Sequence, residues 1–271
     1  MGVVTTASPA PLGSWTRTLN EEDALALLDA AHPGMSVADW EERGDGLLPQ
    51  ASPARRRELV RMVREELLDS QEGVVRESTW LHLLQEGSSH RRLGLLYGRL
   101  WRSRPLVLRA LDTLVHPALA RVDRPLAPHD ADLLDAETWD AFLRSVLRPE
   151  VPHEAFVKTR STLQGALRSV GVLSIGTASA AAPLSVTRAR VTRARHGRPD
   201  PLAFAWVLAR EVGERGEEAE AWAARGSFAA RLFATTPEYA STCVDAGVTA
   251  GLLRRGYLMG QGRLQVGPEL R

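Results

Sequence analysis

The residues best suited to chemistry form a long cationic segment in the second half of the chain. Residues 155–199 contain no Asp or Glu, but they contain eight cations: Lys158, Arg160, Arg168, Arg188, Arg190, Arg193, Arg195 and Arg198. Double-stranded DNA presents a dense line of phosphates, and a protein that places several Arg or Lys side chains along it gains affinity by releasing counterions. The segment therefore predicts contacts with the phosphate backbone of a DNA duplex.

The charge of the whole chain conceals this segment. The 271 residues include 34 Lys+Arg and 33 Asp+Glu, a net charge of +1, so the residues outside the segment sum to −7. Lys158 is the only lysine, and such an excess of arginine also reflects a GC-rich genome. A positive field attracts an acidic protein surface, including that of another copy, as well as DNA. A DNA partner and a protein partner are therefore both open on charge alone.

The order of elements in this segment is typical of a winged helix. Residues 156–170 have a helical pattern that Gly171 ends, and a short apolar strand follows at residues 172–175. After a stretch of small residues, positions 184–191 alternate and are rich in Val and Thr, which predicts a returning strand. Winged helices place a helix in the major groove and a wing beside the backbone. We expect the helix to present Lys158, Arg160, Thr162, Gln164 and Arg168, and the wing to present Arg188, Arg190, Arg193 and Arg195.

A second cationic group lies in the first half of the chain. Ser52 and Pro53 are suited to begin a helix, as an N-cap and a first-turn proline. Within that helix Arg57, Arg61 and Arg64 follow one another at intervals of four and three residues, so all three face the same side. The stripe is either a second DNA contact or a solvated face.

The C-terminal residues 200–271 predict another winged-helix unit. Helices are expected to begin at Asp200, Ser227 and Thr236, and the last of them is expected to run toward Arg255. A short hairpin with a glycine-bearing turn around Gly260 then ends the chain.

The remaining residues also have helical patterns. Asn20 and Ser36 are candidate N-caps, and Gly44 and Gly46 are expected to end the helix that Ser36 begins. Further helices are expected between residues 89 and 122 and at residues 135–147. Their Trp and Phe residues fall on the apolar stripes, which favours a core position over base stacking.

These patterns together predict a mainly α fold, a helical bundle with winged-helix-like units that carry short β-hairpins. The expected division is a disordered tail at residues 1–14, an N-terminal helical domain at 15–150, a basic winged-helix-like helix and wing at 151–199, and a C-terminal winged-helix-like domain at 200–271.

No arrangement of residues indicates catalysis, a metal or a cofactor. The sequence lacks a Walker-type glycine loop and the HExxH, GxSxG and CxxC motifs. The densest titratable group is His129 with Asp130 and Asp132, and its Pro-bounded loop favours a capping or solvated role. Cys243 is the only cysteine, and no apolar run approaches the roughly 20 residues that span a bilayer. We therefore expect a cytoplasmic protein away from the membrane, without enzymatic activity, cofactor or small-molecule substrate.

Several stretches resemble the BrxA family of bacterial BREX phage-exclusion systems. They are Leu47, Leu48 and Gln50 with the Arg-rich helix from Pro53, and the phrase Ser161-Thr162-Leu163 that continues through residues 167–173. The resemblance spans about residues 20–266. It implies a mostly helical, DNA-binding accessory component without its own catalytic activity, which works beside a methyltransferase and other BREX proteins.

The sequence thus predicts a non-catalytic double-stranded DNA-binding accessory protein of a bacterial phage-defence system, which binds mainly through backbone contacts. The alternative is a protein-interaction scaffold whose basic segment docks an acidic partner.

Overall fold

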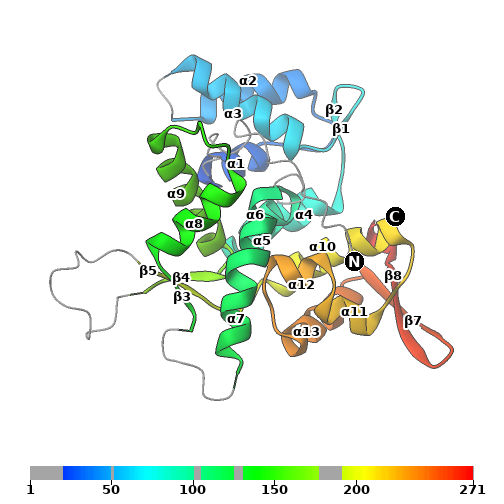
Figure 1. The fold of residues 1–271 in the computed structure, drawn as a ribbon. Coiled ribbons are helices and arrows are strands. Elements are labelled where there is room, and N and C mark those ends of the chain that lie inside the picture. The colour runs from blue at the N-terminus through cyan, green and yellow to red at the C-terminus, as the bar shows by residue number, and fades with distance from the viewer. Residues whose placement is uncertain (1–20, 50–51, 101–104, 125–130, 177–190, 271) are drawn as a thin grey trace. The chain divides into compact units, whose positions relative to one another are not determined.

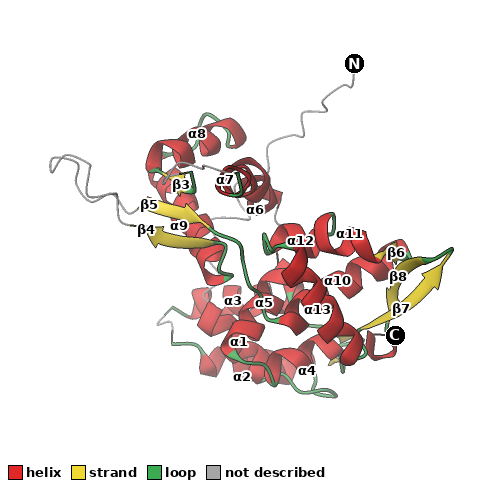
Figure 2. Ribbon diagram, turned by 90° about the horizontal axis from the view of Figure 1, so that it is seen from below, coloured by secondary structure: helices red, strands yellow, loops and turns green. Residues whose placement is uncertain are grey.

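The structure is a computed structural model that describes residues 21–49, 52–100, 105–124, 131–176 and 191–270 (Figure 1). Helices make up most of these residues and the sheets are small, so the prediction of a mainly α fold is confirmed (Figure 2). The chain divides into two compact units. We call residues 104–196 the inserted unit, and residues 19–103 with 197–271 the flanking unit. The predicted boundaries at residues 150 and 199 follow a different division, because helices before residue 150 pack with the basic segment that follows it.

The inserted unit contains helices on a three-stranded antiparallel sheet. Its elements are α6 (Pro105–Ala110), a π-helical turn (Leu111–Val115), α7 (His116–Val122), β3 (Leu133–Leu134), α8 (Ala136–Val146), α9 (His153–Ser169), β4 (Leu173–Gly176) and β5 (Val191–Ala194). The sheet order is β3-β5-β4, with Leu133 opposite Arg193 and Leu173 opposite Ala194.

Trp139 and Phe142 lie in the core of the inserted unit. Both are buried, with ring centroids 6.5 Å apart in an edge-on arrangement. The indole of Trp139 donates to the hydroxyl of Thr192 (2.9 Å), which in turn donates to the carbonyl of Leu134 (3.0 Å). The prediction that these aromatic side chains serve the core is confirmed.

The flanking unit is built from both ends of the chain. Its first part contains α1 (Glu21–Asp29), α2 (Val37–Leu47), α3 (Pro53–Glu66), β1 (Ser70–Gln71), β2 (Val74–Val75), α4 (Thr79–Gln85) and α5 (Ser89–Leu100). Its second part contains α10 (Pro201–Arg215), β6 (Glu218–Ala219), α11 (Glu220–Arg225), α12 (Phe228–Leu232), α13 (Pro237–Thr249), β7 (Leu253–Leu258), β8 (Gln261–Val266) and a 3-10 turn (Pro268–Leu270).

One order of elements occurs three times along the chain. A helical segment leads into a short extended segment, further helices follow, and a hairpin ends the repeat. In each repeat the short extended segment pairs with the last strand of the hairpin. The three pairings are Ser36 with Val74 of β2, β3 with β5, and β6 with β8. We call residues 21–75, 105–194 and 201–266 the first, second and third repeats. The helix before each hairpin, which we call the third helix, is α3, α9 and α13 in turn.

Side-chain caps begin several of the helices. Ser36, Asp200, Ser227 and Thr236 each accept a hydrogen bond from a backbone N–H in the first turn of the helix that they begin, as predicted, and Asp135 does so at the start of α8. Ser52 makes no such bond, although Pro53 does occupy the first turn. Asn20 and residues 1–14 lie outside the described residues.

Two predicted helix ends are wrong. Helix α2 continues through Gly44 and Gly46 to Leu47. Gly44 is buried, and a Cβ there would lie 2.7 Å from Leu27 Cδ2, so this glycine permits close packing against α1 and does not end the helix. Helix α13 ends at Thr249 rather than near Arg255, because Gly251 takes a φ of 73° that turns the chain into β7.

Helix α10 is the centre of the flanking unit, and glycines bring its neighbours close. A Cβ on Gly94 of α5 would lie 2.8 Å from Ala203 Cβ, and one on Gly247 of α13 would lie 2.6 Å from Ala205 Cβ. A Cβ on Gly98 would overlap the side chain of Val207. The absence of side chains at these positions lets α5 and α13 pack directly against α10.

Arg99 at the end of α5 fixes the chain before the first hairpin. Its guanidinium donates to both oxygens of Asp69, at 2.6 and 2.9 Å, and lies 4.7 Å from the ring centroid of Trp80. Burial raises the pKa of the Asp69 carboxyl, but the hydrogen bonds from Arg99 outweigh it and hold the pKa below the ordinary value of 3.8.

Asp69→Asn should therefore weaken the fold near neutral pH and make it less sensitive to acid. A carboxyl whose pKa is depressed by folding stabilises the protein above its unfolded-state pKa, and this contribution disappears as the pH falls through the folded-state value. Because the side chain of Asp69 is 35% exposed, the loss at neutral pH should be on the order of 1 kcal/mol. Urea unfolding of wild type, Asp69→Asn and the exposed control Glu42→Gln at neutral and acidic pH measures this. An identical acid response in all three proteins would contradict the role of Asp69.

Candidate nucleic-acid interface

Helix α9 carries the polar face predicted for the basic segment. Leu163 and Leu167 are buried, whereas Lys158 is exposed and Arg168 is half-buried. Thr162 and Gln164 are half-buried on the same helix. Lys158 makes no ion pair with the described residues, and the Nε of Arg168 donates only to the carbonyl of Gln164 (3.2 Å).

Two of the predicted contact residues are held by carboxylates of their own unit. Arg160 pairs with Asp140 of α8 at 2.5 Å, and Arg193 of β5 pairs with Asp132 at 2.6 Å. The basic segment contains no acid along the chain, but folding brings Asp123, Asp132 and Asp140 against it. Arg160 and Arg193 therefore have part of their charge neutralised before any partner binds.

The region of the predicted wing is described only at its end. Arg195 directly follows β5, is exposed, and donates from Nε to the carbonyl of Gly171 (2.7 Å). This bond places its guanidinium beside the turn between α9 and β4. Arg188, Arg190 and most of the predicted strand at residues 184–191 lie outside the described residues.

Helix α3 presents two of the three arginines in the predicted stripe. Arg57 and Arg61 are exposed; Arg57 Nε reaches only the carbonyl of Pro53 at 3.4 Å, and Arg61 has no polar contact with the described residues. Arg64 instead pairs with Glu41 of α2 at 2.6 Å and lies 3.6 Å from Glu65. The outward cationic face of α3 is therefore Arg57 and Arg61.

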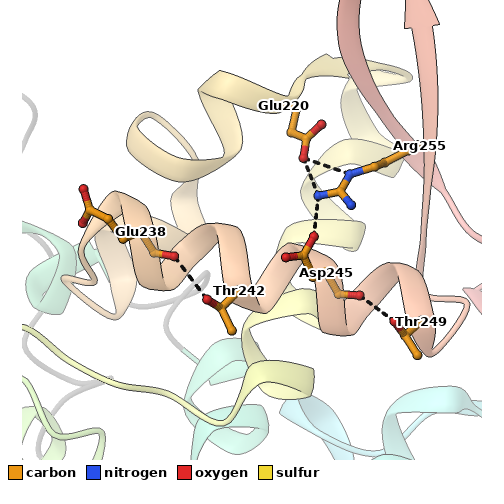
Figure 3. Close-up of polar contacts among 6 residues, drawn as sticks. All are labelled: Glu220, Glu238, Thr242, Asp245, Thr249 and Arg255. Carbon is orange, nitrogen blue, oxygen red and sulfur yellow. Dashed lines mark hydrogen bonds and ion pairs between the residues drawn. The ribbon is translucent and has the colours of Figure 1, made fainter.

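Helix α13 has the opposite character. Its exposed residues are Glu238, Ser241, Thr242, Asp245 and Thr249, and no cation occurs in the helix. The hydroxyls of Thr242 and Thr249 donate back to carbonyls of the same helix (Figure 3). The signal was readable in principle, because the only charged side chains of residues 237–249 are two carboxylates.

Arg255 of β7 links its strand to α13, and carboxylates already pair with its charge. Its guanidinium donates to Glu220 Oε1 at 2.5 and 2.9 Å and to Asp245 Oδ1 at 2.6 Å (Figure 3). The hydrogen bonds to Glu220 and then Asp245 raise the pKa of Arg255 above its ordinary value. The face of α13 is therefore acidic to neutral and would repel phosphates.

The described residues give no support to a metal centre or a reactive thiol. No group of three or more His, Cys, Asp or Glu side chains is placed to hold a metal ion within them. Cys243 is buried in α13, and burial raises the pKa of its thiol to about 12. His129 and Asp130 lie outside the described ranges, and Asp132 is the partner of Arg193. Within those ranges, no helix combines the length and apolar character that a bilayer crossing requires.

Comparison with known proteins identifies a similar fold. No family model and no curated protein matches the chain. An SspB crystal structure is similar over 97% of this chain and 85% of its own, with a TM-score of 0.50 and 14% sequence identity. A magnesium ion-bound SspB crystal structure has the same coverage, with a TM-score of 0.48 and 15% identity. At this level of identity the likeness concerns the fold alone.

Proposed function

We propose that this chain is a non-catalytic double-stranded DNA-binding protein whose three repeats are winged-helix units. The observation that carries the proposal is that α3 and α9 hold the same position before a hairpin, and both expose cations. A winged helix contacts DNA with this helix. The proposed DNA contacts are Arg57 and Arg61 in the first repeat, and Lys158 and Arg168 in the second. Arg195, beside the second hairpin, is the fifth.

The contacts are proposed to go mainly to the phosphate backbone. Apart from the arginines, which can contact either phosphates or guanine, the exposed faces of both helices carry few groups that pair with base edges, since Gln164 is half-buried and its neighbour is Gly165. Contacts from separate cations to phosphates position a protein without reading sequence. Binding should therefore depend strongly on salt and weakly on base composition.

The biological setting proposed is a bacterial phage-defence system of the BREX type, with the chain as a cytoplasmic accessory component beside other BREX proteins. The support is the resemblance of residues 20–266 to BrxA. The similarity to SspB contributes the fold and nothing about partners.

Titrating wild-type protein against random-sequence, AT-rich and GC-rich duplexes at increasing salt tests the proposal. Five phosphate contacts predict a slope of about −4.5 for log K against log salt. Affinities for the three duplexes should agree within a few fold. Absence of a DNA shift at low salt, together with retention of an acidic host protein in a pull-down, would overturn DNA binding and favour the scaffold alternative.

A further inference from the structure

An exposed apolar cluster lies at the end of the hairpin in the third repeat. Tyr257, Leu258 and Met259 are 80%, 51% and 97% exposed, and we call them the hairpin tip. Large apolar side chains grouped on an exposed surface are typical of a binding site, whereas scattered ones are common and neutral. The hairpin tip groups three of the most exposed apolar side chains of the described residues.

The hairpin holds this tip in one conformation. Strands β7 and β8 pair continuously from Leu253 opposite Val266 to Leu258 opposite Gln261. The two turn residues, Met259 and Gly260, have φ values of 50° and 79°, which is the geometry of a tight two-residue hairpin turn. A tip that is ordered before binding loses little conformational entropy on docking.

The surroundings of the tip disfavour DNA as its partner. Residues 257–262 carry no charge, and the neighbouring strand and helix supply Glu218, Glu220 and the acidic face of α13. Of the three arginines on these strands, Arg255 is bound by Glu220 and Asp245 and Arg263 lies 3.8 Å from Glu217, whereas Arg254 is exposed. A protein surface that combines apolar contacts with cations fits these properties better than a phosphate backbone does.

The inserted unit offers a surface of that kind. A cavity of about 440 Å³ lies between the end of α8 and the start of α9, lined by Leu147, Val151 and Phe156. Arg144 and Arg148 stand at the same cavity, exposed and without an ion pair to the described residues. We call this cavity the α8–α9 hollow. A guanidinium stacked over a tyrosine ring makes a favourable cation–π contact, so these arginines complement Tyr257. The apolar lining of the hollow complements Leu258 and Met259.

The charges of the two units favour contact between different copies. Residues 104–196 contain 13 cations and 9 acids, a net charge of +4, whereas residues 19–103 with 197–271 contain 20 cations and 24 acids, a net charge of −4. Opposite fields of this kind steer two surfaces together and suppress contact between like surfaces. The inserted unit of one copy should therefore attract the flanking unit of another.

We propose that the hairpin tip of one copy docks into the α8–α9 hollow of a second copy. Each copy has one tip and one hollow, so the contact is head-to-tail and generates a ring or an open row of copies. The contact does not depend on DNA binding, because it uses none of the residues assigned to DNA.

Crosslinking between engineered cysteines tests the contact directly. Cys243 is buried with a raised pKa, so introduced thiols should react selectively. Met259→Cys and Arg148→Cys proteins, one carrying a size tag, are mixed and mildly oxidised. We expect their mixed disulfide to exceed, by about tenfold, that of a control pair of Arg225→Cys with Arg148→Cys. Arg225 is exposed on α11, away from the tip in sequence. Equal yields in the two mixtures would overturn the proposal. So would a protein carrying both Met259→Cys and Arg148→Cys whose disulfide forms only within one copy and never between copies.

Sedimentation of the uncrosslinked protein provides the second measurement. Wild type should gain mass with concentration, and Tyr257→Ser with Met259→Ser should weaken self-association at least about tenfold. Both side chains are exposed, so circular dichroism should show an unchanged fold. Arg225→Ser serves as the control and should associate like wild type. A wild type that stays monomeric at its highest soluble concentration, or variants that associate unchanged, would refute the contact.

Discussion

Gly98→Val is expected to lower the free energy of unfolding of the flanking unit by about 3 kcal/mol. The new side chain would enter the space of Val207, where α5 and α10 pack without an intervening side chain. Tight interiors accommodate added carbons only through backbone shifts or poor rotamers, which typically costs 1–3 kcal/mol. Leu95 and Leu96 of α5 are also buried, so α5 cannot move away without opening the core.

A glycine in the same unit provides the matched control for this substitution. Gly46 of α2 has no atom within 4 Å of an added Cβ, so Gly46→Ala should raise helix propensity and stabilise by about 0.5–1 kcal/mol. Urea unfolding followed by tryptophan fluorescence compares both variants with wild type. Should Gly98→Val unfold at the wild-type midpoint, the close approach of α5 and α10 would be wrong.

The helix starts could be predicted because their cause is local. A side chain such as Asp135 or Asp200 bonds to a backbone N–H two or three residues away, so the signal lies within one turn of sequence. Helix ends were harder. Gly44 resembles a helix terminator in sequence, but its position against Leu27 and Val60 makes it a packing residue. That distinction depends on contacts far along the chain.

The first hairpin was missed although its turn has a readable pattern. Glu72 and Gly73 take φ values of 53° and 77°, the same turn geometry as Met259 and Gly260 in the third repeat. Strands β1 and β2 have only two residues each, too few for an alternating pattern to stand out. The shared order of elements in the first and third repeats is therefore visible in the strand pairing of the structure but not in the amino-acid sequence.

The cationic segment shows why charge along a chain overstates charge on a surface. Its acid-free sequence suggested that every cation was available, yet Arg160 and Arg193 meet Asp140 and Asp132 across the fold. Such pairs join residues 20 and 61 positions apart. Their existence depends on the topology of the unit. Of the other cations on α9, Lys158 is exposed and Arg168 is half-buried, and neither forms an ion pair with the described residues.

Removing the outward cations of α3 and α9 together should nearly abolish duplex binding at moderate salt. The variant combines Arg57→Ala, Arg61→Ala, Lys158→Ala and Arg168→Ala. Each lost phosphate contact reduces the slope of log K against log salt by about 0.9, so four should reduce it by about 3.6. Affinity should fall on the order of 100-fold, by a similar factor for every duplex sequence. Fluorescence anisotropy over a salt series measures both quantities.

The control removes the same charge from other faces. Arg43, Arg124, Arg225 and Arg254 are exposed, make no side-chain hydrogen bond or ion pair with the described residues, and lie outside α3 and α9. Replacing these four by Ala gives the same net charge as the test variant, so the long-range attraction to DNA falls equally in both. A direct contact predicts that only the test variant loses the salt dependence. Equal losses in the two variants would mean that DNA responds to the overall charge of the protein, and would remove α3 and α9 as the binding surface.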